Sequence, residues 1–144
     1  MHDAFWSSDE FDERAHQLYN EAQYDEAVEV LRQGLHLYPD AVELHIGMGY
    51  ARLAREEFAW ARRAFADALV KSARSGYDFA TLARKYSIDT TRDKGGDLGT
   101  RKPGGFGKAI DLAILRLDVN QVSEPLVYGN KLMIVKVTDR KSVV

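Results

Sequence analysis

Few side chains in this sequence could carry chemistry. Asp89 follows the end of a predicted helix and precedes Thr90 and Thr91, so its carboxylate is either a catalytic candidate or an ordinary turn former. The chain has no cysteine, which excludes disulfides, thiolate metal sites and cysteine nucleophiles. The histidines show no paired ligand spacing, and we expect neither a metal nor another cofactor. The four histidines are His2, His16, His36 and His45.

Two glycine-rich segments, residues 94–99 and 103–107, follow Asp89 in the chain. Neither ends in Lys followed by Ser or Thr, and neither joins a strand to a helix, so a phosphate loop is excluded. We expect tight turns there instead. The basic residues of this region are typical of a solvated surface, although they could also select acidic or phosphorylated ligands. They are Lys94, Arg101, Lys102 and Lys108.

Short helices and a hairpin must position these residues. Gly76 breaks a preceding helix, and Asp78 is a suitable cap for a new helix that ends near Tyr86. Residues 110–117 have the apolar spacing of another short helix. Two predicted strands follow, 123–128 and 132–138, joined by the turn residues Gly129 and Asn130.

A 34-residue repeat occupies the preceding half of the chain. This is the period of one helix-turn-helix unit of a helical solenoid, so residues 7–74 are predicted to form two helix pairs. Five positions recur at this spacing: Ala15, Tyr24, Ala27, Leu31 and Gly34 return as Gly49, Phe58, Ala61, Phe65 and Ala68.

Residues 24–27, the spacing of Leu31 and Gly34, Pro39 and residues 58–65 resemble the tetratricopeptide repeat family. The resemblance implies a concave groove, lined by the first helix of each pair, that binds peptides. The alternative is that Ile46, Tyr50 and Leu53, from the first helix of the second pair, pack against the following module and leave no free groove. The groove residues implied by the resemblance are Asp12, His16, Tyr19, Asn20, Ile46, Tyr50 and Leu53.

The order of motifs in the second half resembles the parvulin family of peptidyl-prolyl isomerases. These motifs are residues 77–89, 95–99, 122–125 and 134–141. The resemblance implies an antiparallel sheet flanked by short helices, with a shallow cleft for proline. We therefore predict an α+β protein with a repeat domain over residues 7–74 and a truncated parvulin-like module over residues 75–141.

The resemblance also implies roles for single residues. Asp89 matches the polar Cys or Asp of the family's site, and Tyr128 stands where Thr is common. Met133 stands where the family has its second histidine, and the other histidine belongs to an opening strand that we expect this chain to lack. Three residues match the apolar floor under the proline ring: Leu98, Phe106 and Ile110. Phe106 and Ile110 could equally be ordinary core residues.

Composition and charge argue against nucleic acid and membranes as partners. The net charge of −2 and the pI of about 6.1 provide no basic field for nucleic acid. We see no apolar run of 18 residues and no secretory signal, so we expect no membrane association and a cytoplasmic location. We predict a peptide-binding adaptor or chaperone-accessory protein with a degenerate isomerase-like module. The alternatives are an active peptidyl-prolyl isomerase, and a recombined or engineered chimera without a ligand.

The expected loss of the opening strand would leave one side of residues 132–137 unpaired. An open, apolar, β-branched edge favours association with other strands. We expect a homodimer to form through this edge. The unpaired edge could instead be covered by the repeat helices, by residues 1–6, or by an extended peptide from a partner.

Overall fold

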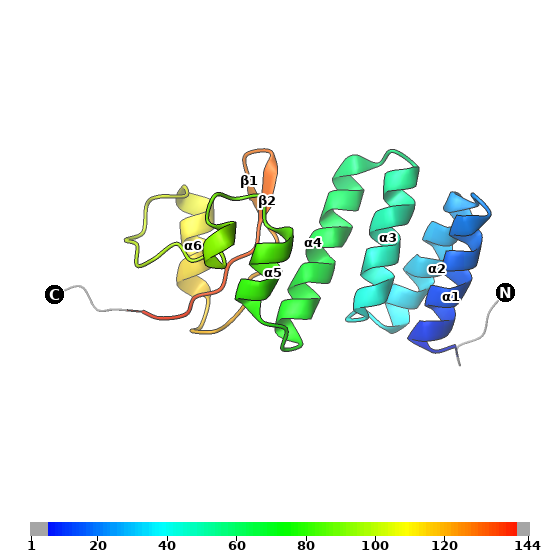
Figure 1. Ribbon diagram of the computed structural model, residues 1–144, viewed down its shortest axis with the longest axis horizontal. Helices are drawn as coiled ribbons and strands as arrows, with labels where there is room; N and C mark the ends of the chain where they lie inside the picture. The colour runs from blue at the N-terminus through cyan, green and yellow to red at the C-terminus, as the bar shows by residue number, and fades with distance from the viewer. Residues whose placement is uncertain (1–5, 141–144) are drawn as a thin grey trace. The chain divides into compact units, whose positions relative to one another are not determined.

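The computed structural model describes residues 6–140, and the predicted α+β class is confirmed (Figure 1). Six α-helices, one short 3₁₀ helix and one two-stranded antiparallel sheet are formed by these residues. The chain divides into two compact units, the first ending at Lys71 and the second beginning at Ser72. The described residues exclude residues 1–5, which contain His2 and most of the segment suggested above as a cover for the open strand edge. They also exclude residue 141, the last of the predicted module.

Helices in pairs make up the first unit, as the 34-residue spacing predicts. They are α1 (Ser8–Asn20), α2 (Tyr24–Leu37), α3 (Val42–Ala54) and α4 (Phe58–Arg74), of which α4 continues past Lys71. A capping box begins α1, since the Ser7 hydroxyl accepts from the Glu10 N–H and the Glu10 carboxylate accepts from the Ser7 N–H.

The turns inside the two helix pairs repeat the same backbone conformation at the same 34-residue spacing. Ala22 and Glu56 both adopt the left-handed region, with φ of 58° and 61°. Each turn is closed by the residue that follows, because the Gln23 N–H donates to the Leu18 carbonyl at 2.8 Å and the Glu57 N–H donates to the Arg52 carbonyl at 2.9 Å. The repeat therefore extends to backbone geometry, although both turn positions lack the glycine that this conformation favours.

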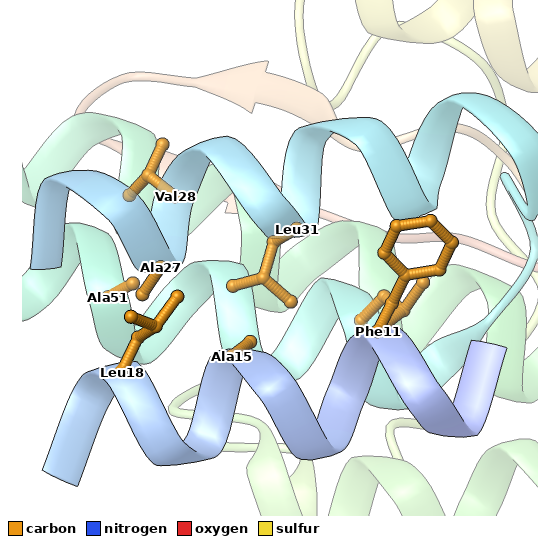
Figure 2. Packing of buried hydrophobic residues seen from close by; sticks show 8 residues of the cluster. Phe11, Ala15, Leu18, Ala27, Val28, Leu31 and Ala51 are labelled. Atoms are coloured by element: carbon orange, nitrogen blue, oxygen red, sulfur yellow. The ribbon is translucent and has the colours of Figure 1, made fainter. Parts of the chain in front are cut away.

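Apolar side chains from α1, α2 and α3 form one core (Figure 2). Gly34 of α2 leaves space for the ring of Phe11, because a Cβ atom there would lie 2.9 Å from that ring. Gly49 of α3 likewise leaves space for the ring of Phe65 of α4, because a Cβ atom at Gly49 would lie 2.5 Å from that ring. The cluster consists of Phe11, Ala15, Leu18, Ala27, Val28, Leu31, Leu44 and Ala51.

The second unit contains the predicted short helices and hairpin. Its helices are α5 (Phe79–Tyr86), the 3₁₀ helix η1 (Arg92–Lys94) and α6 (Lys108–Arg116). As expected, the Asp78 carboxylate caps α5 by accepting from the Thr81 N–H. Strands β1 (Leu126–Tyr128) and β2 (Lys131–Met133) pair with Leu126 opposite Met133, so the predicted hairpin is confirmed.

Both strands are shorter than the predicted 123–128 and 132–138, and the reason lies around Pro125. Proline has no N–H to donate to a strand ladder, so regular pairing stops there. Pairing resumes only as an isolated bridge between Val122 and Lys136. Buried Ser123 closes the gap, because its N–H donates to the Val135 carbonyl at 2.8 Å and its hydroxyl accepts from the Val135 N–H at 3.0 Å.

Candidate functional site

The glycine turn at residues 95–96 fixes the loop of the second unit against α5. Gly95 has φ of 69°, and a Cβ atom there would lie 2.7 Å from the Cβ of Ala80. The Gly96 N–H donates to the Thr91 carbonyl at 3.0 Å. Only glycine combines this backbone conformation with such a close approach, so the turn positions the segment that carries Leu98.

Asp89 is exposed and is held in a local turn. Its Oδ2 accepts from the Thr91 N–H at 3.1 Å and from the Thr91 hydroxyl at 2.5 Å. These hydrogen bonds lower the pKa of Asp89, and the charge of Lys131 lowers it further. The carboxylate is therefore ionised at neutral pH, and its geometry is that of the turn-forming alternative.

The structure brings two of the predicted proline-pocket residues together. The rings of Phe106 and Tyr128 meet edge to face, with centroids 5.8 Å apart, and the Arg101 guanidinium lies 5.7 Å from the Phe106 centroid. Tyr128 precedes the hairpin turn and pairs with Lys131 in the sheet. The positive charge of Lys131 is close enough to Asp89 to lower its pKa. Aromatic, cationic and carboxylate groups thus gather near the hairpin.

The other predicted pocket residues are buried or half-buried. Ile110 on α6 is only 5% exposed, as the core alternative expects. Leu98 and Met133 are half-buried, and Met133 lies opposite Leu126 in the sheet. Since α6 contacts β1, Ile110 and Tyr128 belong to neighbouring elements.

Arg140 has a positioning role that the sequence reasoning missed. Its Nη2 donates to the carbonyls of Ile114, Leu115 and Leu117 at 2.8, 3.3 and 2.5 Å. These carbonyls lie at the end of α6, where helix carbonyls lack the N–H four residues on and the helix dipole favours a cation. Arg140 therefore ties the last described segment to α6, and its place in the motif of residues 134–141 was the only sequence signal for this role.

In the first unit, four of the seven predicted groove residues line one cavity. The cavity has a volume of about 280 Å³ and lies among α1, α2 and α3. His16, Tyr19, Asn20 and Tyr50 line it. Asp12 lies one helical turn before His16, and Ile46 and Leu53 are exposed on α3 outside the lining. The floor consists of Ala15, Ala27, Leu31, Gly47 and Ala51.

Within residues 6–140, no group of three or more His, Asp or Glu side chains is arranged to hold a metal ion. None of the helices in this part of the chain has both the length and the apolar character that a membrane span requires.

Comparison with known proteins identifies the class. Residues 45–139 match the family described as rotamase, PPIC-type PPIase domain, which is well over half of the chain. The chain therefore belongs to the PPIC-type peptidyl-prolyl isomerase family. The match begins within α3, so it includes residues 45–74, which form most of α3 and all of α4 in the structure. The boundary at residues 74 and 75 and the tetratricopeptide resemblance stay predictions.

Several curated proteins are similar to this chain. Foldase protein PrsA 4 of Bacillus cereus is 43% identical over 68 residues, which cover 46% of this chain and 24% of that protein. Periplasmic chaperone PpiD of Haemophilus ducreyi is 39% identical over 95 residues, 65% of this chain and 14% of that protein. Chaperone SurA of Methylobacillus flagellatus is 45% identical over 51 residues, 35% of this chain and 12% of that protein.

The chain thus spans about a quarter or less of the length of these relatives. No solved structure shows a significant match.

Proposed function

We propose that the protein is a chaperone-accessory protein that binds extended segments of other proteins, and that its isomerase-type module holds proline-containing segments with little catalysis. The relatives named above as foldases and chaperones support a role with protein substrates. The contact between Phe106 and Tyr128 supports an apolar surface for proline.

The hydrogen bonds and the lowered pKa of Asp89 support the proposal that the module catalyses isomerisation only weakly. The barrier to prolyl isomerisation, ~18–20 kcal/mol, comes from amide resonance, so a catalyst must bind the twisted amide better than the planar one. Asp89 uses Oδ2 to accept two hydrogen bonds from Thr91, and its lowered pKa keeps it from donating a proton. Met133, at the position where histidine is expected, has no hydrogen-bond donor.

Exchange NMR on a short proline peptide tests this proposal. We expect cis-trans exchange to stay close to the slow uncatalysed rate, on the order of tens to hundreds of seconds. We also expect saturable shifts of the Phe106 and Tyr128 resonances, because the apolar surface still binds the peptide. Asp89→Ala should leave both results unchanged.

Asp97→Ala is the matched control, because Asp97 also accepts a hydrogen bond in a local turn, from the Gly99 N–H at 2.8 Å. Acceleration by the original protein that is lost in Asp89→Ala and retained in Asp97→Ala would establish an active isomerase instead. Absence of any saturable shift would favour a chimera without a ligand.

We also propose that the open edge of β2 pairs with a second copy of the chain. The Val135 carbonyl accepts from Ser123, so Val135 and Met133 face the neighbouring strand. Backbone groups alternate in an antiparallel ladder, which directs those of Leu132, Ile134 and Lys136 to the other side. None of these three has a recorded backbone partner there among residues 6–140.

This edge is symmetric about Ile134. If Ile134 pairs with its own copy, Leu132 lies opposite Lys136 on both sides, so no like charges meet directly. Every outward N–H and carbonyl of the three residues then finds a partner.

Light scattering tests the dimer. We expect twice the chain mass of 16.3 kDa for the original protein and a monomer for Ile134→Pro, which removes the central donor while proline remains tolerated on an edge strand. Val127→Pro is the control, since Val127 is exposed on the opposite edge of the hairpin and should remain dimeric. A strict monomer before mutation, or equal effects of both prolines, would contradict pairing through β2.

A further inference from the structure

The cavity of the first unit has the size and lining of a site for one apolar side chain. Its volume of about 280 Å³ lies just below the 300–1,000 Å³ typical of pockets for drug-sized ligands. Its floor is apolar, from residues such as Leu31 and Ala51, whereas His16, Asn20 and two tyrosines line its other sides. An extended peptide could insert a Leu or aromatic side chain and keep its backbone at the polar rim.

Both tyrosines of the cavity are braced by a second aromatic ring. Tyr19 meets Tyr24 edge to face at 5.3 Å, and Tyr50 meets Phe65 in the same way at 5.2 Å. Tyr50 nevertheless remains 53% exposed. A rim that is already ordered loses little side-chain entropy when a ligand binds, so these contacts favour binding.

The charges of the first unit favour a cationic partner. Residues 6–71 contain 13 Asp and Glu side chains against 7 Lys and Arg. Most of the basic groups are already paired with acidic ones, and no Lys or Arg lines the cavity. The recorded pairs are Arg32 with Glu29, Arg52 with Glu57, Arg55 with Asp25 and Glu57, Arg63 with Asp67, and Lys71 with Asp40.

Asp12 brings this negative charge to the cavity. It lies four residues before His16, on the same face of α1, with its Oδ1 3.4 Å from the His16 Nδ1. Its Oδ1 is buried, and within residues 6–140 the contact with His16 is too long and poorly aligned to satisfy this oxygen as a well-formed hydrogen bond would. Burial raises the pKa of Asp12 despite the opposing effect of His16, and the charges of Glu43 and Asp9 raise it further. A carboxylate oxygen in this state gains from a cation supplied by a ligand.

We propose that this cavity binds an apolar side chain of an extended peptide that carries a neighbouring Lys or Arg, whose cation pairs with Asp12 and Glu43. The proposal names a ligand class for the protein-binding role proposed above and rests on that role. It places the ligand in the first unit, whereas the residues implied for proline belong to the second.

Fluorescence anisotropy with proline-free peptides tests this site. Two labelled ten-residue peptides share a central Leu, flanked by Lys in one and by Glu in the other. We expect the Lys peptide to bind at least about tenfold more tightly, and to weaken as salt is added, because its cation meets a partly buried carboxylate. Equal binding of the two peptides, or binding of neither, would overturn the proposal.

Variants separate the site from general stability. Tyr50→Ala and Asp12→Asn should each weaken the Lys peptide about tenfold. Phe58→Ala, at an aromatic residue that is 60% exposed and does not line the cavity, should leave it unchanged. Asp12→Asn should also keep or raise the melting temperature, because it removes the charge of a partly buried carboxylate. A lower melting temperature together with weaker binding would show that Asp12 is merely structural and would overturn its role.

The two proposals fail separately. The peptides here contain no proline, whereas the exchange experiment reports on Phe106 and Tyr128. If the Lys peptide binds but the proline peptide causes no shifts at Phe106 and Tyr128, the cavity proposal stands and the proline surface is refuted. If the proline peptide causes these shifts but the Lys peptide does not bind, only the cavity proposal is refuted.

Discussion

Gly95→Ala is expected to lower the free energy of unfolding of the second unit by about 2 to 5 kcal/mol. Two effects combine in this estimate. An alanine at φ of 69° costs roughly 1–2 kcal/mol, and its Cβ would lie 2.7 Å from the Ala80 Cβ, an overpacking that costs roughly 1–3 kcal/mol. The variant should therefore open the contact between the glycine turn and α5.

Gly99→Ala is a matched control for the conformational effect. Gly99 has φ of 70°, almost the same as Gly95, but no atom lies within 4 Å of a Cβ built there. This variant should cost only about 1–2 kcal/mol. The difference between the two variants isolates the close approach to Ala80.

Amide hydrogen exchange of α5 and η1 measures both effects, because opening free energies are read locally and do not depend on the first unit. Adding Ala80→Gly to Gly95→Ala should restore part of the lost stability, since it removes the atom in conflict. Equal losses in Gly95→Ala and Gly99→Ala would show that the packing between the turn and α5 contributes nothing.

Phe11→Ala should destabilise the first unit by about 3–5 kcal/mol, the usual range for removing a buried aromatic ring. Phe11 is fully buried, fills the space that Gly34 leaves, and meets the rings of Trp6 and Tyr38 edge to face at 5.3 and 6.3 Å. The cavity residues Ala15 and Leu31 belong to the same core, so peptide binding should be lost as well.

Chemical denaturation followed by tryptophan fluorescence measures this loss, because Trp6 packs against Phe11. Phe58→Ala removes an equal ring from an exposed position and should change stability by less than about 1 kcal/mol. A loss in Phe11→Ala no greater than that of Phe58→Ala would mean that the α1–α2–α3 core does not stabilise the unit.

Much of the fold follows from local sequence signals. The apolar spacing and the 34-residue period predicted the helix pairs, because each helix buries one face against its neighbour. Asp78 predicted the start of α5, and Gly129 with Asn130 predicted the hairpin. The strand lengths were predicted wrongly, because the effect of Pro125 on pairing depends on which residues lie across the sheet.

The candidate site was only partly accessible from sequence. Family resemblance named Phe106 and Tyr128, which the structure places in contact. Arg140 was missed because its three acceptors lie more than 20 residues away, at a helix end whose position no local pattern specifies. The proline-site roles of Leu98, Met133 and Ile110 stay predictions, with Ile110 buried as a core residue would be.

By itself, the sequence determined the helical periodicity, the glycine turns and the order of motifs that marks the isomerase family. These are local properties, set by side-chain spacing and backbone conformation within a few residues. The local sequence left both roles of Asp89 open, and the structure shows its carboxylate held in the turn by Thr91. Only the tertiary structure decided that Asp12 keeps a buried oxygen without a hydrogen bond and that Arg140 holds the end of α6. The reason is physical, since a carboxylate's hydrogen bonds and solvation depend on the atoms that folding places around it.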